Sequence, residues 1–335
     1  MPLRNAPLPR MAGDLTFMRS RRATLDELHS QNLAILGAPT EDNVGRKSGT
    51  RFAPTALRET SVYFGWHANP QFSHPVDINV RVPIDTSQMH GRLVDIGDFA
   101  LQGMPQASVA QAIRSTMQQI AGTNASVILL GGDDSIVSPA IAGVAQGRPV
   151  GFIQVGGQLP GTVSGVVPGA VSGELGAISA GQCSLAHLLS DRHVIPGTTA
   201  AIACADRTSV EFMQGFQRAG GLMLSAADVL RARAGVIEQT ARRLIDEAGS
   251  LHVHFDVSAF RPSLHGMSER PSLGGLTLPD LQRMLGEIGR VPVSTLIVTG
   301  LNPTLSGLSV VKTGLRLTVT ALLAYIYSRL DLAQA

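Results

Sequence analysis

The stretch Ser126-Val127-Ile128-Leu129-Leu130-Gly131-Gly132-Asp133-Asp134-Ser135 decides the fold of this 335-residue chain. Its apolar first half has the Val, Ile and Leu content of a strand that is buried on both faces of a parallel sheet. Two glycines and two aspartates follow, which is typical of a turn at the carboxyl end of such a strand. In open α/β sheets ligands bind beside these strand ends, so this turn is also a candidate site.

Working outward, seven further apolar runs predict strands, and helical periodicity lies between most of them. The strands are expected at 126–130 and at 33–37, 93–96, 150–155, 200–204, 221–224, 251–257 and 294–298. Helices are expected at 54–62, 105–121, 210–219, 236–248, 278–289 and 308–329. This alternation predicts an α/β fold in which helices cover both faces of a mainly parallel, eight-stranded sheet.

The chain shows no internal repeat and no linker between two compact halves. We therefore predict a flexible N-terminal arm at 1–25 and a single domain at 26–335.

Composition excludes several classes of protein. Charged residues make up 16% of the chain, well below the ~25% of ordinary globular proteins, and the apolar share of 44% excludes disorder. The net charge is +2 and the arginines are scattered, so we expect no nucleic acid as a partner. The C-terminal apolar run, 315–327, is shorter than the ~18 residues of a membrane span. Two cysteines give neither a disulfide framework nor a zinc motif, so we expect a cytoplasmic protein without a membrane partner.

Four strand ends carry the residues that could form a site. One is the turn after 126–130, and two others are Gln154-Val155-Gly156-Gly157-Gln158-Leu159-Pro160 and Gly300-Leu301-Asn302-Pro303. The fourth belongs to the strand at 251–257. There the residues at a spacing of two share one face, because side chains alternate along a strand. They are His252, His254, Asp256 and Ser258.

At these residues the chain resembles the ureohydrolase family of arginases and agmatinases. The stretches that carry the resemblance follow the family's order and cover about residues 33–330. They resemble its P-G-x-R-x-G-P-x-A-I-R, D-x-G-D, L-G-G-D-H-S, S-F-D-x-D and G-G-L-T motifs, and lie at 49–58, 93–98, 129–135, 253–258 and 274–277. The resemblance implies the three-layer αβα, arginase-like ureohydrolase fold.

The resemblance also implies a chemistry, hydrolysis of a C–N bond at a guanidinium carbon by a hydroxide that bridges two manganese or nickel ions. Two neighbouring dications need several anionic ligands and imidazoles. The family takes six such ligands from three motifs, and most of them are replaced here. The replacements, in chain order, are Asp134 for a histidine, Gly156 for an aspartate, Gln158 for a histidine, Pro160 for an aspartate and Ser258 for an aspartate. Only Asp256 is retained. A glutamate that grips the guanidinium in some members corresponds to Gly300.

The surrounding loop has lost its charges as well. Between 149 and 190, where the family places ligands and substrate loops, Glu174 is the single Asp, Glu, Lys or Arg. Groups for acid–base catalysis, or for pairing with a cationic substrate, are therefore missing from this segment. We predict no catalytic residue and no metal or other cofactor in this chain.

Two interpretations of the histidine strand stay open. A reshaped one-metal site could use Asp134, His254 and Asp256, since two carboxylates and imidazole nitrogen can hold nickel, zinc or iron, and His252 could add a further nitrogen. We favour the alternative in which the histidines pack and hydrogen-bond within the sheet while Asp256 caps a loop. His252 also lies toward the buried start of the strand.

The other chemically suggestive residues have a structural explanation. Asp133 is expected to accept backbone N–H hydrogen bonds at the start of a helix that begins at Ser135 rather than act as an acid. For Arg51 and Arg58 the resemblance implies contacts that stabilise the fold. Cys183 and Cys204 lack a partner histidine in any recognisable signature, which argues against a thiol nucleophile.

We therefore expect a catalytically inactive ureohydrolase-like subunit. Its partner would be an active ureohydrolase paralogue in a hetero-oligomer, a hexamer, since family interfaces are equivalent in such rings. The partner subunit would hold nickel or manganese and hydrolyse a guanidine or biguanide such as metformin. The alternatives are a one-metal hydrolase acting on a C–N bond and a homo-oligomeric protein that binds a small molecule.

Overall fold

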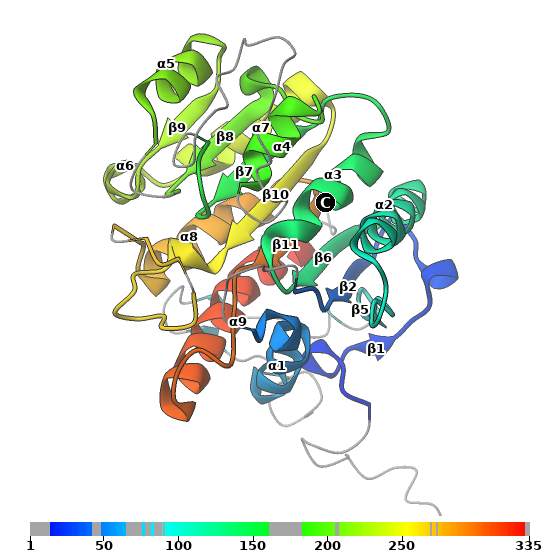
Figure 1. The fold of residues 1–335 in the computed structure, drawn as a ribbon. Coiled ribbons are helices and arrows are strands. Elements are labelled where there is room, and N and C mark those ends of the chain that lie inside the picture. The colour runs from blue at the N-terminus through cyan, green and yellow to red at the C-terminus, as the bar shows by residue number, and fades with distance from the viewer. Residues whose placement is uncertain are drawn as a thin grey trace, which may run out of the picture.

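The computed structural model describes residues 14–41, 48–64, 76–77, 82–83, 89, 91–160, 183–204, 208–268, 270–272 and 274–331. Within these residues a parallel sheet has the strand order β1-β5-β2-β6-β11-β10-β7-β8-β9 (Figure 1). The strands are β1 (Arg21–Arg22), β2 (Leu33–Ala38), β5 (Leu93–Asp98), β6 (Ser126–Gly131), β7 (Gly151–Val155), β8 (Thr199–Ile202), β9 (Leu222–Leu224), β10 (Leu251–Asp256) and β11 (Val293–Thr299). A separate antiparallel pair joins β3 (Val76–Asp77) to β4 (Val82–Pro83).

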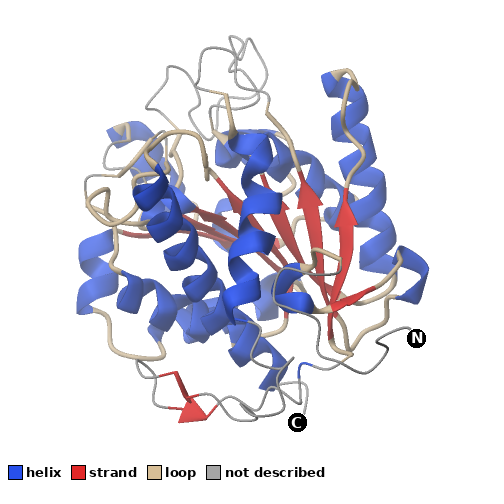
Figure 2. Cartoon of the chain, turned by 90° about the horizontal axis from the view of Figure 1, so that it is seen from below, coloured by secondary structure: helices blue, strands red, loops and turns tan. Residues whose placement is uncertain are grey.

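Helices cover both faces of the sheet (Figure 2), as the α/β prediction requires. One hydrophobic cluster packs α1 (Ala53–Ser61), α6 (Ala226–Arg231), α7 (Val236–Ala248), α8 (Leu278–Gly289) and α9 (Leu308–Asp331) against one face. The other packs α2 (Gln106–Gly122), α3 (Val137–Ala145), α4 (Ser184–Ser190) and α5 (Val210–Arg218) against the opposite face. The three-layer αβα arrangement is therefore confirmed.

All eight predicted strands are present, but the sheet has nine, so the predicted count is corrected. The additional strand is β1, in which Arg21 pairs with Val94 and Arg22 with Asp95 of β5. Both arginines are exposed, and two charged residues at a sheet edge carry no apolar pattern that a sequence reading could detect.

The additional strand lies inside the segment expected to form a flexible arm. Phe17 and Met18 are fully buried, and the Phe17 N–H donates to Asp95 Oδ2 at 2.8 Å. The Met18 N–H donates to Ser61 Oγ at 2.7 Å. The described part of the arm is thus packed against β5 and α1, because two large apolar side chains leave water there.

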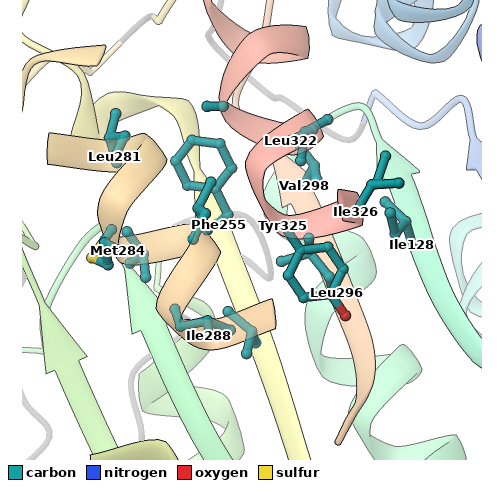
Figure 3. Packing of buried hydrophobic residues seen from close by; sticks show 14 of the residues in the cluster. Ile128, Phe255, Leu281, Met284, Ile288, Leu296, Val298, Leu322, Tyr325 and Ile326 are labelled. Atoms are coloured by element: carbon teal, nitrogen blue, oxygen red, sulfur yellow. The ribbon is translucent and has the colours of Figure 1, made fainter. Parts of the chain in front are cut away.

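The largest part of the core lies between β10, β11 and the α8–α9 pair (Figure 3). Tyr325 of α9 lies beside Leu296 of β11 in this view, and Phe255 of β10 lies between the two helices. Each of these three side chains is fully buried. Burial of such large side chains contributes ~2–3 kcal/mol each, so this packing holds the two central strands, and the loops after them, in place.

Helix α9 (Leu308–Asp331) matches the helix predicted at 308–329 and extends beyond the apolar run 315–327 at both ends. Its segment Leu308–Leu330 has the length and composition of a membrane-spanning helix, and 56% of the most apolar window is buried within the protein. That burial is the contact with α8 and α1. The apolar character of α9 is therefore accounted for by its place in the core.

Candidate functional site

The four loops expected to form a site are neighbours. The strands β6, β11, β10 and β7 follow one another in the sheet and run in the same direction. Their carboxyl ends therefore meet at one edge, and the turns after them lie side by side.

The imidazole of His254 is engaged within the sheet. Its Nε2 lies 2.7 Å from Thr299 Oγ1 of β11, and the side chain is only 1% exposed. Burial lowers the pKa of His254 to about 4, although the charge of Asp256 acts in the opposite direction. His254 thus packs and hydrogen-bonds within the sheet, as the favoured interpretation predicted, and it is neutral at physiological pH. Thr299 was not identified from the sequence, since a threonine near a strand end carries no signal of its own.

The carboxylate of Asp256 faces backbone. Its Oδ1 accepts a hydrogen bond from the Ser258 N–H at 2.7 Å, which caps the 3₁₀ turn Val257–Ala259. Thr299 Oγ1 donates to Oδ2 at a longer 3.5 Å. The predicted capping role of Asp256 is confirmed.

The loop after β7 is closed against the end of β10. Gly156 and Gly157 both have φ +72, which favours glycine over residues with a Cβ. A Cβ on Gly156 would lie 2.7 Å from the carbonyl oxygen of Asp256 and 2.8 Å from the backbone nitrogen of Ala259. The Gly157 N–H donates to Ser258 Oγ at 2.9 Å. Where the family places an aspartate, this backbone leaves no room for a side chain.

Gln154 completes the closure from inside the strand. Its Nε2 donates to the carbonyl oxygens of Gly156 at 3.1 Å and Gln158 at 3.0 Å. Its Oε1 is buried and has no hydrogen-bond partner among the described residues. Gln154 belongs to the stretch expected at this strand end, but no role was predicted for it. A glutamine in an otherwise apolar strand, fully buried in the structure, is the signal that could have identified that role.

Of the two aspartates after β6, Asp133 accepts hydrogen bonds from hydroxyl groups. Asp133 is buried, and its Oδ1 accepts hydrogen bonds from Thr40 Oγ1 at 3.1 Å and Ser135 Oγ at 2.6 Å. Asp133 thus accepts hydrogen bonds in its turn, but these two donors are hydroxyl groups. Within the described turn, its side chain makes no capping bond to the backbone N–H groups that were predicted as donors. Asp134 begins the 3₁₀ turn Asp134–Ile136.

These residues do not fit the two-metal centre that the resemblance to ureohydrolases implies. Among the residues the structure describes, no three His, Cys, Asp or Glu side chains are grouped so that they could hold a metal ion. The most suggestive donors, His254 Nε2 and both oxygens of Asp256, are engaged by hydroxyl groups and backbone. The candidates Asp134, His254 and Asp256 are therefore not assembled into a metal centre. Glu174 and the rest of 161–182 lie outside the described residues.

The two thiols are placed next to the same loop. Cys183 Sγ donates to the Gln158 carbonyl oxygen at 3.3 Å, and Cys204 Sγ donates to that of Gln154 at 3.7 Å. Burial raises the pKa of Cys183 to about 12 and raises that of Cys204 further. Since the thiolate is the nucleophile, neither cysteine is poised for catalysis.

Arg58 is a structural residue, as the resemblance implied. Its Nε and Nη2 contact the two carboxylate oxygens of Asp95 at 2.8 and 3.0 Å, and Nη1 contacts Asp98 at 2.6 Å. Burial alone would lower the pKa of Arg58, but the two carboxylates raise it above its ordinary value. Arg51, by contrast, is exposed, stacks on Phe52 at 4.8 Å and pairs with Glu41 at 3.3 Å. Neither arginine lines the closed loop.

Comparison with known proteins supports the fold. Residues 31–156 match the sequence model of the arginase family. The chain is 18% identical to the formimidoylglutamase of Bacillus subtilis, with a TM-score of 0.73 over 98% of this chain and 96% of that one. For the proclavaminate amidino hydrolase of Streptomyces clavuligerus the values are 19% and 0.71, over 97% and 100% of the two chains.

Sequence similarity extends over a smaller part of the chain. A guanidinobutyrase of Pseudomonas aeruginosa is 27% identical over 157 residues, which cover 46% of this chain and 45% of that protein. A mitochondrial guanidino acid hydrolase of Rattus norvegicus is 28% identical over 124 residues, 37% of this chain and 32% of that protein. The chain therefore matches less than half of the length of these two relatives. Its architecture is the arginase-like ureohydrolase fold.

Proposed function

We propose that this chain is a non-catalytic ureohydrolase-like subunit. It assembles with an active paralogue whose two nickel or manganese ions hydrolyse a guanidine or biguanide compound such as metformin, and it supports the stability or activity of that partner. In this respect it resembles the non-catalytic subunit of metformin hydrolase. A hetero-oligomer, in particular a hexamer, is the assembly we propose.

One observation carries the proposal, the closure of the loop after β7 onto β10. The backbone at Gly156 occupies the space that a ligand side chain would need, and Gln154 and Ser258 hydrogen-bond the loop in that position. The surrounding scaffold nevertheless keeps the arginase-like architecture over nearly its whole length. A subunit that acts through contacts with its partner needs the scaffold but not an open ligand loop, and this chain has that combination.

The surface offers apolar side chains for such an assembly. Phe52 and Tyr63, which flank α1, are 48% and 51% exposed, and Leu308 at the start of α9 is 69% exposed. Helices α1 and α9 pack against each other, and Thr304 Oγ1 donates to the Ser48 carbonyl oxygen at 2.7 Å, which joins the segments before these two helices. Large apolar and aromatic side chains are enriched where subunits meet.

Co-expression with an active ureohydrolase paralogue from the same organism tests the proposal. We expect the two chains to copurify, native mass measurement to give their ratio, and nickel or manganese to travel with the partner. The chain expressed alone should hold no stoichiometric metal and should not hydrolyse guanidine, guanidinobutyrate or metformin. Stoichiometric metal together with hydrolysis by the isolated chain would overturn the proposal and favour the one-metal hydrolase, in which case Asp256→Ala should remove both.

A second candidate, a homo-oligomeric small-molecule binding protein, rests on a different cavity. About 450 Å³ of space lies beside the ends of β8 and β9, with Met213, Met223, Leu230 and Cys204 among its mostly apolar lining. Pockets of this size and character accept small ligands. A thermal-shift screen of the isolated chain tests this candidate, because a ligand that binds only the folded state raises the melting temperature.

A further inference from the structure

A larger cavity lies at the opposite edge of the sheet from the closed loop. It has a volume of about 630 Å³ and is lined by the starts of β10, β11 and β6, by the ends of α2 and α3, and by the end of α9. This edge holds the amino ends of the strands, so the cavity is separate from the site that the fold implies.

The formal charge in this cavity has a single sign. No aspartate or glutamate is among its lining residues, whereas Arg148 and Arg329 both are. Arg329 Nη2 donates to Ser126 Oγ at 2.9 Å, while its Nε is buried without a hydrogen-bond partner in the part of the chain that is described. Arg148 is exposed and can turn toward an occupant. Guanidinium groups match the planar geometry of carboxylate and phosphate oxygens.

A buried histidine lines the same cavity from β10. His252 is 2% exposed, and its Nδ1 has no hydrogen-bond partner among the described residues. It is in register with Thr295 of β11, which also lines the cavity. A buried polar nitrogen without a partner destabilises the protein. An occupant that hydrogen-bonds to His252 would recover part of the lost stability.

The helix ends define what else the occupant should carry. Helices α2 and α3 end beside the cavity, and the last carbonyl groups of a helix present about half a negative charge. Near the guanidinium groups, the two positive charges of the arginines outweigh the partial negative charge of the helix ends. Hydroxyl or amino groups on the occupant could donate hydrogen bonds to the helix carbonyl groups.

We propose that this cavity binds a small organic anion whose carboxylate or phosphate group is held by Arg148 and Arg329. The polar body of the anion reaches His252 at the inner end. Inorganic phosphate and citrate are suitable probes, since they present the two anionic groups separately and citrate adds a hydroxyl donor.

Titration calorimetry on the full chain, at constant ionic strength with chloride as the reference salt, tests the proposal. We expect saturable 1:1 binding of at least one probe, and the preferred probe identifies the anionic group. Arg148→Gln should raise Kd by about tenfold or more, since a hydrogen bond to a charged group contributes ~1.5–3 kcal/mol. Arg231→Gln removes the same charge from an exposed position outside the cavity and should leave Kd unchanged.

Arg148 is the main variant because an exposed side chain can be replaced without unfolding the protein. Arg329→Gln should weaken binding as well, with circular dichroism showing that the fold is kept. If neither probe binds saturably, or if Arg148→Gln and Arg231→Gln bind with equal affinity, the proposal is overturned.

Discussion

Gly300 lies directly against the carboxylate of Asp256. A Cβ built on Gly300 would lie 2.8 Å from Oδ1 and 2.9 Å from Oδ2, and the residue has φ +82. The single aspartate retained from the implied metal ligands thus faces a position where only glycine fits. The side chain that grips a guanidinium in some ureohydrolases cannot be added at this place without moving Asp256.

Gly300→Ala should therefore destabilise the fold. A positive φ costs a residue with a Cβ ~1–3 kcal/mol, and crowding against a fixed side chain costs ~1–3 kcal/mol more. Gly91→Ala is a matched control, because Gly91 has φ +77 but an added Cβ would meet no atom within 4 Å. Urea unfolding should show the larger loss for Gly300→Ala. Equal losses would contradict the close contact with Asp256.

Arg58→Met should be among the most destabilising single changes in α1. It leaves the buried carboxylate of Asp95 without its bidentate partner, and breaking a buried pair in this way costs ~3–5 kcal/mol. Arg242→Met removes the exposed pair with Glu238 at 2.7 Å and should cost less than ~1 kcal/mol. The midpoints of urea unfolding measure both values, and a small effect at Arg58 would contradict its structural role.

Much of the fold could be predicted from the sequence, because buried parallel strands such as 126–130 and 251–257 carry continuous apolar patterns. The predicted runs recovered the eight longer strands, although the bounds of several shifted by one or more residues. Strands β1, β3 and β4 and helices α4 and α6 were not predicted, and α3 was not among the predicted helical ranges. The first five have seven residues or fewer, so hydrophobic periodicity has too little length to appear.

The candidate site could also be predicted in part only. Replacement of ligands at Gly156 and Ser258 could be read from the sequence through the resemblance. The closure itself could not, since it depends on two consecutive positive φ angles and on the side chain of Gln154 turning back toward the loop. Backbone conformation at glycine is weakly encoded, because glycine populates both signs of φ.

The stability of the fold should decrease below neutral pH because of its buried histidines. Burial lowers the pKa of His265 to about 4 from an ordinary 6.5, as it does for His252 and His254. The unfolded chain therefore takes up these protons first as the pH falls. The stability contribution is fully present above pH 6.5 and is lost between about 6.5 and 4, at up to ~1.4 kcal/mol per pH unit for each histidine.

His265→Gln should flatten this dependence. The side chain of His265 stacks on Phe260 at 4.8 Å and contacts Thr318 Oγ1 at 3.0 Å, so the variant is also expected to lower the stability at pH 7. The slope of unfolding free energy between pH 6.5 and 4 is the decisive quantity. His29→Gln changes an exposed histidine and should leave the slope as it is. An unchanged slope in His265→Gln would contradict a neutral, buried His265.

The thiols should react slowly in the native state. Burial raises the pKa of Cys183 to about 12, so little thiolate exists at pH 7, and Cys204 is at least as strongly shifted. Ellman's reagent should modify the buried Cys183 only after unfolding, whereas Cys204 is partly exposed at the cavity beside β8 and β9 and should react slowly in the folded chain. Rapid modification of Cys183 in the folded chain would show that the segment around Gln158 opens readily.

Restoring the missing ligand residues should not restore a metal centre. The variant Asp134→His, Gly156→Asp, Gln158→His, Pro160→Asp, Ser258→Asp restores all five. Its new Cβ at 156 would meet the backbone of Asp256 and Ala259 at 2.7 and 2.8 Å. The change at 258 also removes the hydroxyl group that accepts the Gly157 N–H. We expect lower stability and no stoichiometric manganese or nickel by metal analysis after gel filtration.

Gly157→Ala controls for backbone strain alone. Gly157 has the same φ as Gly156, but an added Cβ would lie no closer than 3.2 Å to another residue, at Gln154 Nε2. Two metal ions per chain in the restored variant would mean that the loop can reopen, and that its closure follows from the lost ligands rather than from the packing of Gly156 against β10.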